Sequence, residues 1–201
     1  MRYFATASGP RVRDAMLSGA IGQIATPAAG NRVLPVDWIA DNAVFGGKYP
    51  GDGAYLDWLR SRPHRELCRF AVAPDVVADH EATLHRSLPL LGLIRRIVPV
   101  AFVAQNGSTP SWVPWPLFDA LFIGGSTDWK LGAEAREMVR AAKRNGKWVH
   151  MGRVNSQERY SYAERIGCDS VDGTYLAFGP NKNLPKVLWW TRPALFPLEV
   201  A

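Results

Sequence analysis

The sequence predicts one (β/α)8 barrel that spans residues 1–201 as a single domain. Eight short β-rich runs alternate with helical segments, which is the order of elements that builds a parallel sheet. The run 98–104 is apolar along its whole length, as a strand buried on both faces is. No Gly-x-Gly-x-x-Gly motif follows the first run, so a closed barrel is favoured over an open dinucleotide-binding sheet.

The first four strands are expected where β-branched, aromatic and other apolar residues cluster. A loop rich in Pro, Ala and Gly follows the second strand, because proline and glycine favour turns. The expected strands are 3–6, 21–25, 36–40 and 69–73, the helices are 11–18, 53–61 and 79–96, and the loop is 27–31.

The second half of the chain repeats the alternation. A Trp/Pro-rich loop, with a short segment near Trp115, follows the fifth strand, and an amphipathic helix follows the sixth. The last strand is weak and leads into a basic, aromatic tail. The expected strands are 98–104, 120–123, 147–150 and 170–171, and the helices are 132–144 and 156–166.

The composition indicates a cytoplasmic protein with a polyanionic partner. The net charge is +6 and there are eight tryptophans, which favours nucleic acid, although a basic enzyme without such a partner has the same composition. Cys68 and Cys168 form no CxxC pair and are expected to be reduced thiols. Arg95 and Arg96 interrupt the apolar run 88–103, and no basic-then-apolar leader is visible, so we expect no membrane association.

Polar or small residues stand at the ends of six consecutive predicted strands. Catalytic side chains of such barrels lie at the C-terminal strand ends. One Asp after a strand is commonly a helix N-cap, but six such positions in a row are harder to assign to capping. Several carboxylates suit glycosidic chemistry, and an amide with bare glycine backbone suits the edge of a heterocycle. These positions are Asp41, Asp75, Gln105 with Asn106, Gly124 with Gly125, Met151 with Gly152, and Asp172.

In this order the motifs resemble those of the guanine transglycosylases that insert 7-deazaguanines. That family comprises the tRNA-guanine enzymes and relatives in phages and bacteria that modify DNA. The resemblance runs from about Val36 to Thr174. The segment from Asp41 to Gly46 is similar to Asp-Ser-Gly-Gly-Phe/Tyr-Gln, Ala73-Pro-Asp75 to the base-reading aspartate, and Val103-Ala-Gln105-Asn-Gly107 to Val-Gln-Gly-Gly. Phe122-Ile-Gly124-Gly125 resembles Gly-Gly-Leu-Ala-Val-Gly-Glu, His150-Met151-Gly152 resembles Leu-Met-Gly, and Gly167-Cys-Asp169-Ser-Val-Asp172 resembles Gly-Ile-Asp-Met-Phe-Asp.

The resemblance implies a role for each of these residues. Asp172 would be the nucleophile and Asp41 the second catalytic aspartate. Asp75, Gln105 and the backbone of Gly124 and Gly125 would select the base. The base would lie between two further side chains, Phe45 on one face and Met151 on the other.

The chain also departs from that family. The tRNA enzymes carry a Cys₃His zinc site, whereas this sequence has no cysteine beyond Cys168. Val44 replaces the second glycine of Asp-Ser-Gly-Gly, and the base-binding loop lacks its final Glu, with Asp128 and Lys130 nearby. We therefore expect no metal and no cofactor, and we favour DNA over tRNA as the acceptor. The four histidines, His64, His80, His85 and His150, have no metal-ligand spacing, and His150 is expected to be a barrel-wall residue.

The sequence thus predicts an enzyme that exchanges guanine in DNA for a free 7-deazaguanine through a covalent Asp172–sugar intermediate. The alternatives are the same exchange on tRNA, a catalytically silent barrel that binds nucleic acid or a partner, and an unrelated small-molecule enzyme. Trp189 and Trp190 either stack on bases or pack the tail onto the barrel. Two basic clusters are either solvated faces or a phosphate track: Arg62, His64 and Arg65, and Arg140, Lys143, Arg144 and Lys147.

Overall fold

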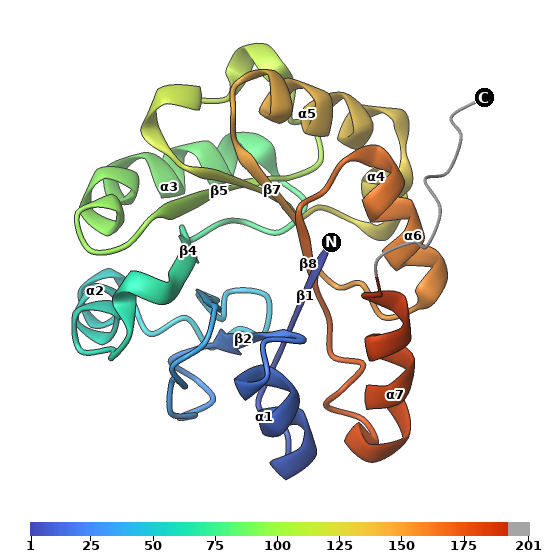
Figure 1. Cartoon of the computed structure of the whole chain (residues 1–201). Helices are drawn as coiled ribbons and strands as arrows, with labels where there is room; N and C mark the ends of the chain where they lie inside the picture. The colour runs from blue at the N-terminus through green and yellow to red at the C-terminus, as the bar shows by residue number, and fades with distance from the viewer. Residues whose placement is uncertain (193–201) are drawn as a thin grey trace.

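The computed structural model describes residues 1–192 as a closed barrel of eight parallel strands. Neighbouring strands pair in sequence order, and β8 pairs back with β1 to close the barrel. Helices surround the barrel, and α7 lies beside α1 and α6 (Figure 1). The predicted (β/α)8 fold is confirmed, while residues 193–201 of the predicted domain lie outside the described residues.

The strands are short and most are followed by a helix. The strands are β1 Arg2–Ala5, β2 Gly22–Ala25, β3 Trp38–Ala40, β4 Cys68–Val72, β5 Val100–Ala104, β6 Ala120–Ile123, β7 Trp148–Met151 and β8 Ser170–Asp172. The α-helices are α1 Pro10–Leu17, α2 Asp52–Arg60, α3 His80–Arg95, α4 Thr127–Leu131, α5 Ala133–Arg144, α6 Gln157–Ile166 and α7 Pro180–Trp190. Three 3-10 turns complete the order: η1 Arg65–Leu67, η2 Pro110–Trp112 and η3 Trp115–Leu117.

Two helical regions differ from the prediction. A separate short helix, α4, precedes α5, because Ser126 caps it by accepting a hydrogen bond from the Trp129 amide. The tail contains a further helix, α7, which the sequence analysis did not assign. Pro180 stands in its first turn, where a missing N–H costs nothing, and its apolar residues Leu184 and Val187 are buried. In residues 1–192 no helix has both the length and the apolar character needed to cross a membrane.

The strands separate two apolar cores. The smaller core fills the barrel and contains Phe4, Ile39 and Phe70 among its buried members. The larger core lies between the strands and the helices. Side chains alternate between the two along each strand, so in β7 His150 contacts the rings inside the barrel while Met151 packs in the outer core.

Candidate active site

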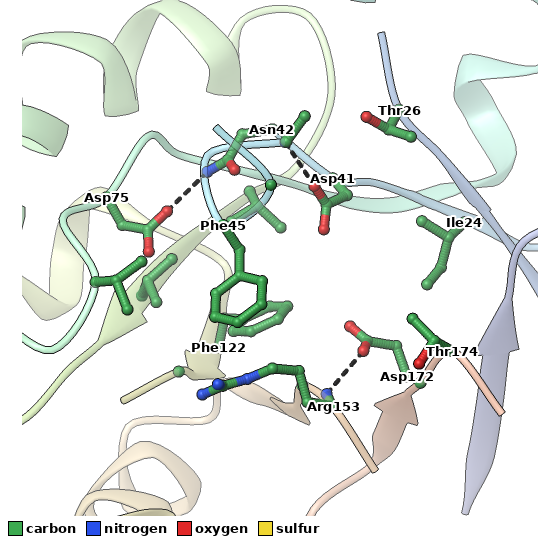
Figure 2. Close-up of a pocket in the computed structure, with 18 of the residues that line it drawn as sticks. Ile24, Thr26, Asp41, Asn42, Phe45, Asp75, Phe122, Arg153, Asp172 and Thr174 are labelled. Atoms are coloured by element: carbon green, nitrogen blue, oxygen red, sulfur yellow. Dashed lines mark hydrogen bonds between the residues drawn. The ribbon is translucent and has the colours of Figure 1, made fainter. Parts of the chain in front are cut away.

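A cavity of about 520 Å³ opens at the C-terminal ends of the strands. Seven of the eight predicted site residues line it, and Figure 2 shows the carboxylates of Asp41 and Asp172 pointing toward one another across it. The barrel brings these residues together from strand ends far apart in the sequence. The seven are Asp41, Phe45, Asp75, Gln105, Gly124, Gly125 and Asp172.

Met151 is the predicted site residue that the structure does not bring to the cavity. Its side chain is buried in the outer core, between the barrel and the helices. The reason is the twofold alternation of a strand: His150 faces the barrel interior, so its neighbour Met151 faces outward. The expected contact between Met151 and a base is therefore wrong for this arrangement.

The strand-end carboxylates do not cap the helices that follow them. The observed side-chain caps stand further along the loops: Asp79 accepts from Ala82 at α3, Ser126 caps α4, and Ser156 accepts from Arg159 at α6. Capping, which is the ordinary use of an aspartate after a strand, thus does not account for Asp41 or Asp75.

Asp172 ends β8 and is held as a carboxylate. His150 Nε2 lies 3.0 Å from its Oδ2, and the backbone N–H of Arg153 donates to its Oδ1 at 2.9 Å. Burial opposes ionisation, but the hydrogen bond and charge of His150, with the Arg153 amide and Lys130, hold the pKa of Asp172 below its usual value. Asp172 is consequently ionised at neutral pH.

His150 belongs to a chain of hydrogen bonds inside the barrel. The Trp148 indole N–H donates to Ser170 Oγ at 2.7 Å, and Ser170 Oγ lies 2.8 Å from His150 Nδ1. An indole nitrogen can only donate, so Ser170 Oγ accepts from Trp148 and still has a proton and a lone pair for the contact with Nδ1. With Nδ1 engaged by Ser170, Nε2 is the ring nitrogen directed at Asp172.

Sequence reasoning treated His150 as a wall residue and missed this contact. The signal was present in the alternation of strand β7, because Trp148 and His150 fall on the same face and Ser170 is paired with His150 in the next strand. A buried histidine two residues from a strand end, opposite a serine, needs hydrogen-bond partners inside the barrel.

Asp41 follows β3, and its pKa is shifted in the opposite direction from that of Asp172. Burial, together with the negative charges of Asp172 and Asp75, raises the pKa of Asp41 to about 6. Its Oδ1 accepts from the Ala43 amide at 2.6 Å, which partly offsets that rise. A carboxyl with a pKa near neutrality can both give and take a proton.

Asp75 is held in place by two side-chain amides. Asn42 Nδ2 donates to its Oδ1 at 3.0 Å, and Gln105 Nε2 donates to its Oδ2 at 2.7 Å. Burial raises the pKa of Asp75, and the two amide hydrogen bonds oppose that rise. Asn42 was not predicted as a site residue, and its second bond, to the Ala73 carbonyl, fixes its orientation.

The hydrogen-bonding groups of Gln105, Gly124 and Gly125 have more partners within the protein than expected. Gln105 Oε1 accepts from the Ala78 amide at 2.9 Å and from the Gly125 amide at 2.7 Å. The Gly124 amide donates to Ala104, and Arg153 donates to the Gly125 carbonyl. The N–H groups of Gly124 and Gly125 are therefore not available to a base, which corrects that part of the role given to the backbone of the pair.

Close packing explains instead why positions 124 and 125 are glycines. A Cβ on Gly124 would stand 2.7 Å from Val103 Cγ1, and one on Gly125 would stand 2.4 Å from Trp129 Cε3. Gly125 also has a φ of 63°, a conformation that favours glycine. The pair lets the loop approach Gln105, and Gln105 in turn orients Asp75.

Phe45 stands at the mouth of the cavity with 64% of its surface exposed. The Arg153 guanidinium lies 4.6 Å from the centre of its ring, and Figure 2 shows the ring of Phe122 next to both. Arg153 was not predicted. It has a φ of 61°, which is rare for a residue with a side chain, and its backbone N–H and guanidinium serve Asp172 and Gly125 respectively.

Lys130 lies behind the cavity wall. Its Nζ donates to the Gly152 carbonyl at 2.6 Å, and the side chain is buried. Burial and the charge of Arg153 lower the pKa of Lys130 to about 7, while Asp172 acts in the other direction. Near neutral pH the ammonium adds positive potential on the Asp172 side of the cavity.

The two basic clusters do not lead to the cavity. Lys143 and Arg144 end α5, just before β7 begins, so they lie at the N-terminal end of the barrel. Lys143 bridges Asp169 at 2.7 Å. Arg62 lies over the ring of Trp58, at the corresponding end of α2. Within residues 1–192 no group of three or more His, Cys, Asp or Glu is placed to hold a metal ion.

No protein-family model matches this sequence, and no curated protein does. The fold is similar to that of solved barrels. Phosphoribosyl anthranilate isomerase from Thermus thermophilus aligns at 12% identity and a TM-score of 0.52, over 94% of this chain and 98% of the isomerase. A chain of the tryptophan synthase α2β2 complex from Pyrococcus furiosus aligns at 12% identity and a TM-score of 0.53, over 94% of each chain.

A third solved barrel is a mandelate racemase/muconate lactonizing enzyme-like protein from Rubrobacter xylanophilus. It aligns at 13% identity and a TM-score of 0.54, over 90% of this chain and 58% of that protein. At these identities the likeness concerns the fold alone, and the chemistry of the cavity has to be argued from its own residues.

Proposed function

We propose that the protein is a nucleic-acid base-exchange enzyme that replaces guanine with a 7-deazaguanine, with DNA as the preferred acceptor. The observation that carries the proposal is a pair of facing carboxyl groups whose pKa values are shifted in opposite directions. Asp172 is stabilised as an anion, whereas the pKa of Asp41 is raised to about 6. Environments that drive two carboxyls apart in this way assign one to attack and the other to proton transfer.

The first half-reaction would break the glycosidic bond. An Asp172 oxygen attacks the sugar carbon and forms an ester-like bond to it, while the bond from that carbon to the purine nitrogen breaks. The departing guanine needs a proton, and protonated Asp41 supplies it. The products of this step are a covalent enzyme–nucleic acid intermediate, free guanine and ionised Asp41.

The second half-reaction reverses these events with a new base. Ionised Asp41 takes the proton from the ring nitrogen of a 7-deazaguanine, and that nitrogen displaces Asp172 from the sugar carbon. Two inversions give net retention of configuration. The scheme uses only side chains of this chain and regenerates both carboxyls.

Base selection is assigned to the bridge of Asn42, Asp75 and Gln105. Each amide holds one oxygen of the Asp75 carboxylate, and the remaining lone pairs suit the N1–H and exocyclic amine of a guanine-like base. Phe45 offers a ring face at the mouth, and a cavity of about 520 Å³ has the size of a ligand pocket. A nucleotide would enter flipped out of its stack.

The backbone of the Asp41 loop supports the same resemblance. Ala43 stands where the transglycosylases have the first glycine of Asp-Ser-Gly-Gly, and its φ is 63°. That is the left-handed region, which glycine enters without strain and alanine rarely adopts. In this chain Ala43 adopts that conformation at the position of the glycine.

Incubation of the protein with radiolabelled guanine or 7-deazaguanine, and with either DNA or tRNA, tests the proposal. We expect label to enter DNA and a denaturant-resistant protein–DNA adduct to form. Label in tRNA alone would reassign the acceptor. Folded wild-type protein that labels neither polymer under any of these conditions would refute base exchange.

A further inference from the structure

A second hollow, of about 660 Å³, lies between the start of α6 and the end of α7. We call it the aromatic groove. Three of the residues that line it are the rings of Tyr175, Trp189 and Trp190, and Lys186 and Asn155 also contribute. The site described above uses none of these rings.

The two tryptophans, which the sequence left undecided, have different environments. Trp190 packs onto the barrel, with its ring centre 5.1 Å from that of Tyr175 and 6.3 Å from that of Tyr3. Trp189 is 59% exposed, and the Arg192 guanidinium lies 4.9 Å from its ring centre. Trp190 therefore forms the wall of the groove, and Trp189 presents a ring that a planar ligand can reach.

The segment that builds this wall is uniformly basic. Between Gly173 and Arg192 the sequence contains Lys182, Lys186 and Arg192 and no Asp or Glu. No Asp or Glu is among the described residues that line the groove, and Lys186 and the Arg192 guanidinium over Trp189 supply positive charge. This combination matches a polyanion that carries planar rings.

The groove adjoins the active-site cavity. Asn155 lines both hollows, and the adjacent residues Thr174 and Tyr175 line the cavity and the groove respectively. The Asn155 side chain holds this junction by accepting from the Tyr175 amide at 3.1 Å. A chain whose nucleotide enters the cavity can thus lay its next residues along α7.

We propose that the aromatic groove binds single-stranded nucleic acid beside the target nucleotide, with an unpaired base on Trp189 and phosphates near Lys186 and Arg192. The substrate class rests on the proposed function, while the binding site does not. An unpaired strand is required because a base in a duplex has no free face to offer a ring. Neighbouring paired bases would have to open with the flipped nucleotide.

A labelled oligothymidine of about 12 nucleotides tests the groove without guanine, and fluorescence anisotropy gives its Kd. We expect Trp189→Ala to weaken binding by about five- to a hundredfold, the range for one stacked base. The matched control is Trp112→Ala, because Trp112 is 63% exposed but lines neither hollow. It should leave the Kd unchanged.

The outcomes separate the groove from base exchange. Loss of oligothymidine binding in Trp189→Ala, from a wild-type protein that exchanges no base, would keep the groove and refute the exchange. Base exchange with the same KM for DNA in wild type and Trp189→Ala would refute the groove alone. Equal weakening by Trp189→Ala and Trp112→Ala, or none by either, would also refute it.

Discussion

The two sides of the active-site cavity shift the pKa of an aspartate side chain in opposite directions. On the β3–β4 side, Asp41 and Asp75 are buried together, and the pKa of each is raised. On the β7–β8 side, Asp172 lies between His150 and the Arg153 amide, and its pKa is lowered. Arg153 and Arg159 line the cavity on this second side with Lys130 behind them, and Lys48 lines it from the loop after β3.

The difference teaches that position at a strand end does not assign a chemical role. All three aspartates follow parallel strands, and all three are candidates in the sequence. The surroundings decide: burial and neighbouring carboxylates raise the pKa on one side, while a histidine, a backbone amide and the Lys130 ammonium lower it on the other. The roles of the aspartates therefore depend on surrounding residues, which the pattern of aspartates in the sequence does not include.

The largest expected effect is on the β7–β8 side. Asp172→Asn removes the nucleophile, so exchange should fall by at least about a thousandfold and the covalent adduct should vanish. Binding of the free base should persist, because Asp75 is untouched. Exchange assays and calorimetric titration with a 7-deazaguanine measure the two properties. Near-normal exchange in this variant would remove the proposed distinction between the two sides.

On the β3–β4 side the expected loss is in binding. Asp75→Ala removes the acceptor of a guanine-like edge, so the affinity for guanine and 7-deazaguanine should fall by about ten- to a hundredfold. Adenine, which lacks the matching donors, should bind weakly to both proteins. Calorimetry of wild type and variant gives the comparison. An unchanged Kd would place the base elsewhere in the cavity.

His150 should act through Asp172 and not through the base. In His150→Leu the carboxylate loses a hydrogen-bond donor, so its pKa should rise and the acid limb of the kcat/KM profile should move up by about one pH unit. Affinity for the free base should stay the same. His150→Gln carries an N–H donor and should restore the profile in part. A purely structural role would lower activity equally at every pH.

Asp41 should make the fold less stable at neutral pH. Its pKa is about 6 in the folded protein and 3.8 in the reference state, so the folded state binds the proton more tightly. Stability is therefore lost as pH rises from about 4 to 6 and stays lower above that range. Asp41→Asn should raise the free energy of unfolding at pH 8 by about 1–3 kcal/mol, and by little at pH 4.

Denaturant unfolding at the two pH values measures this effect, and Asp172→Asn is the matched control. The folded-state pKa of Asp172 is lowered, so its charge stabilises the fold at pH 8 and that variant should be less stable there. Two variants that shift stability in the same direction at pH 8 would contradict the contrast between the sides.

The smallest expected effect concerns metals. The proposed chemistry needs only carboxyls and their hydrogen-bond partners, so chelators should leave exchange unchanged. Elemental analysis of the purified protein should show well under one zinc per chain. A stoichiometric, tightly held metal whose removal abolishes exchange would contradict this prediction, because the two carboxyl sides would then not suffice for the reaction.

The barrel and most of the cavity could be predicted because both follow from local patterns. Apolar runs of four to seven residues mark seven of the eight strands, and the strand ends of a barrel converge, so Asp41, Asp75 and Asp172 were expected to meet. Met151 was misplaced because the resemblance outweighed the twofold alternation, which turns it outward once His150 faces inward.

Other parts of the site depend on contacts that no local pattern encodes. Arg153 reaches the cavity because its backbone adopts a φ of 61° and its side chain then turns over Phe45. The Gln105 amide is occupied by Asp75, Ala78 and Gly125, which come from two different loops. Such partners are fixed only when the barrel closes, so the sequence could name Gln105 but not its task.

The Arg153 guanidinium, which stacks on Phe45, competes with an aromatic ligand for the face of that ring. Both side chains line the cavity, so the guanidinium lies where an aromatic base would meet the ring. A base that takes this place must first displace a cation that is also anchored on the Gly125 carbonyl. The measured affinity is then the intrinsic affinity scaled by the fraction of molecules whose Arg153 has swung away. A base therefore enters by replacing the planar guanidinium of Arg153 on the Phe45 ring. Without a ligand, the protein's own side chain occupies that position.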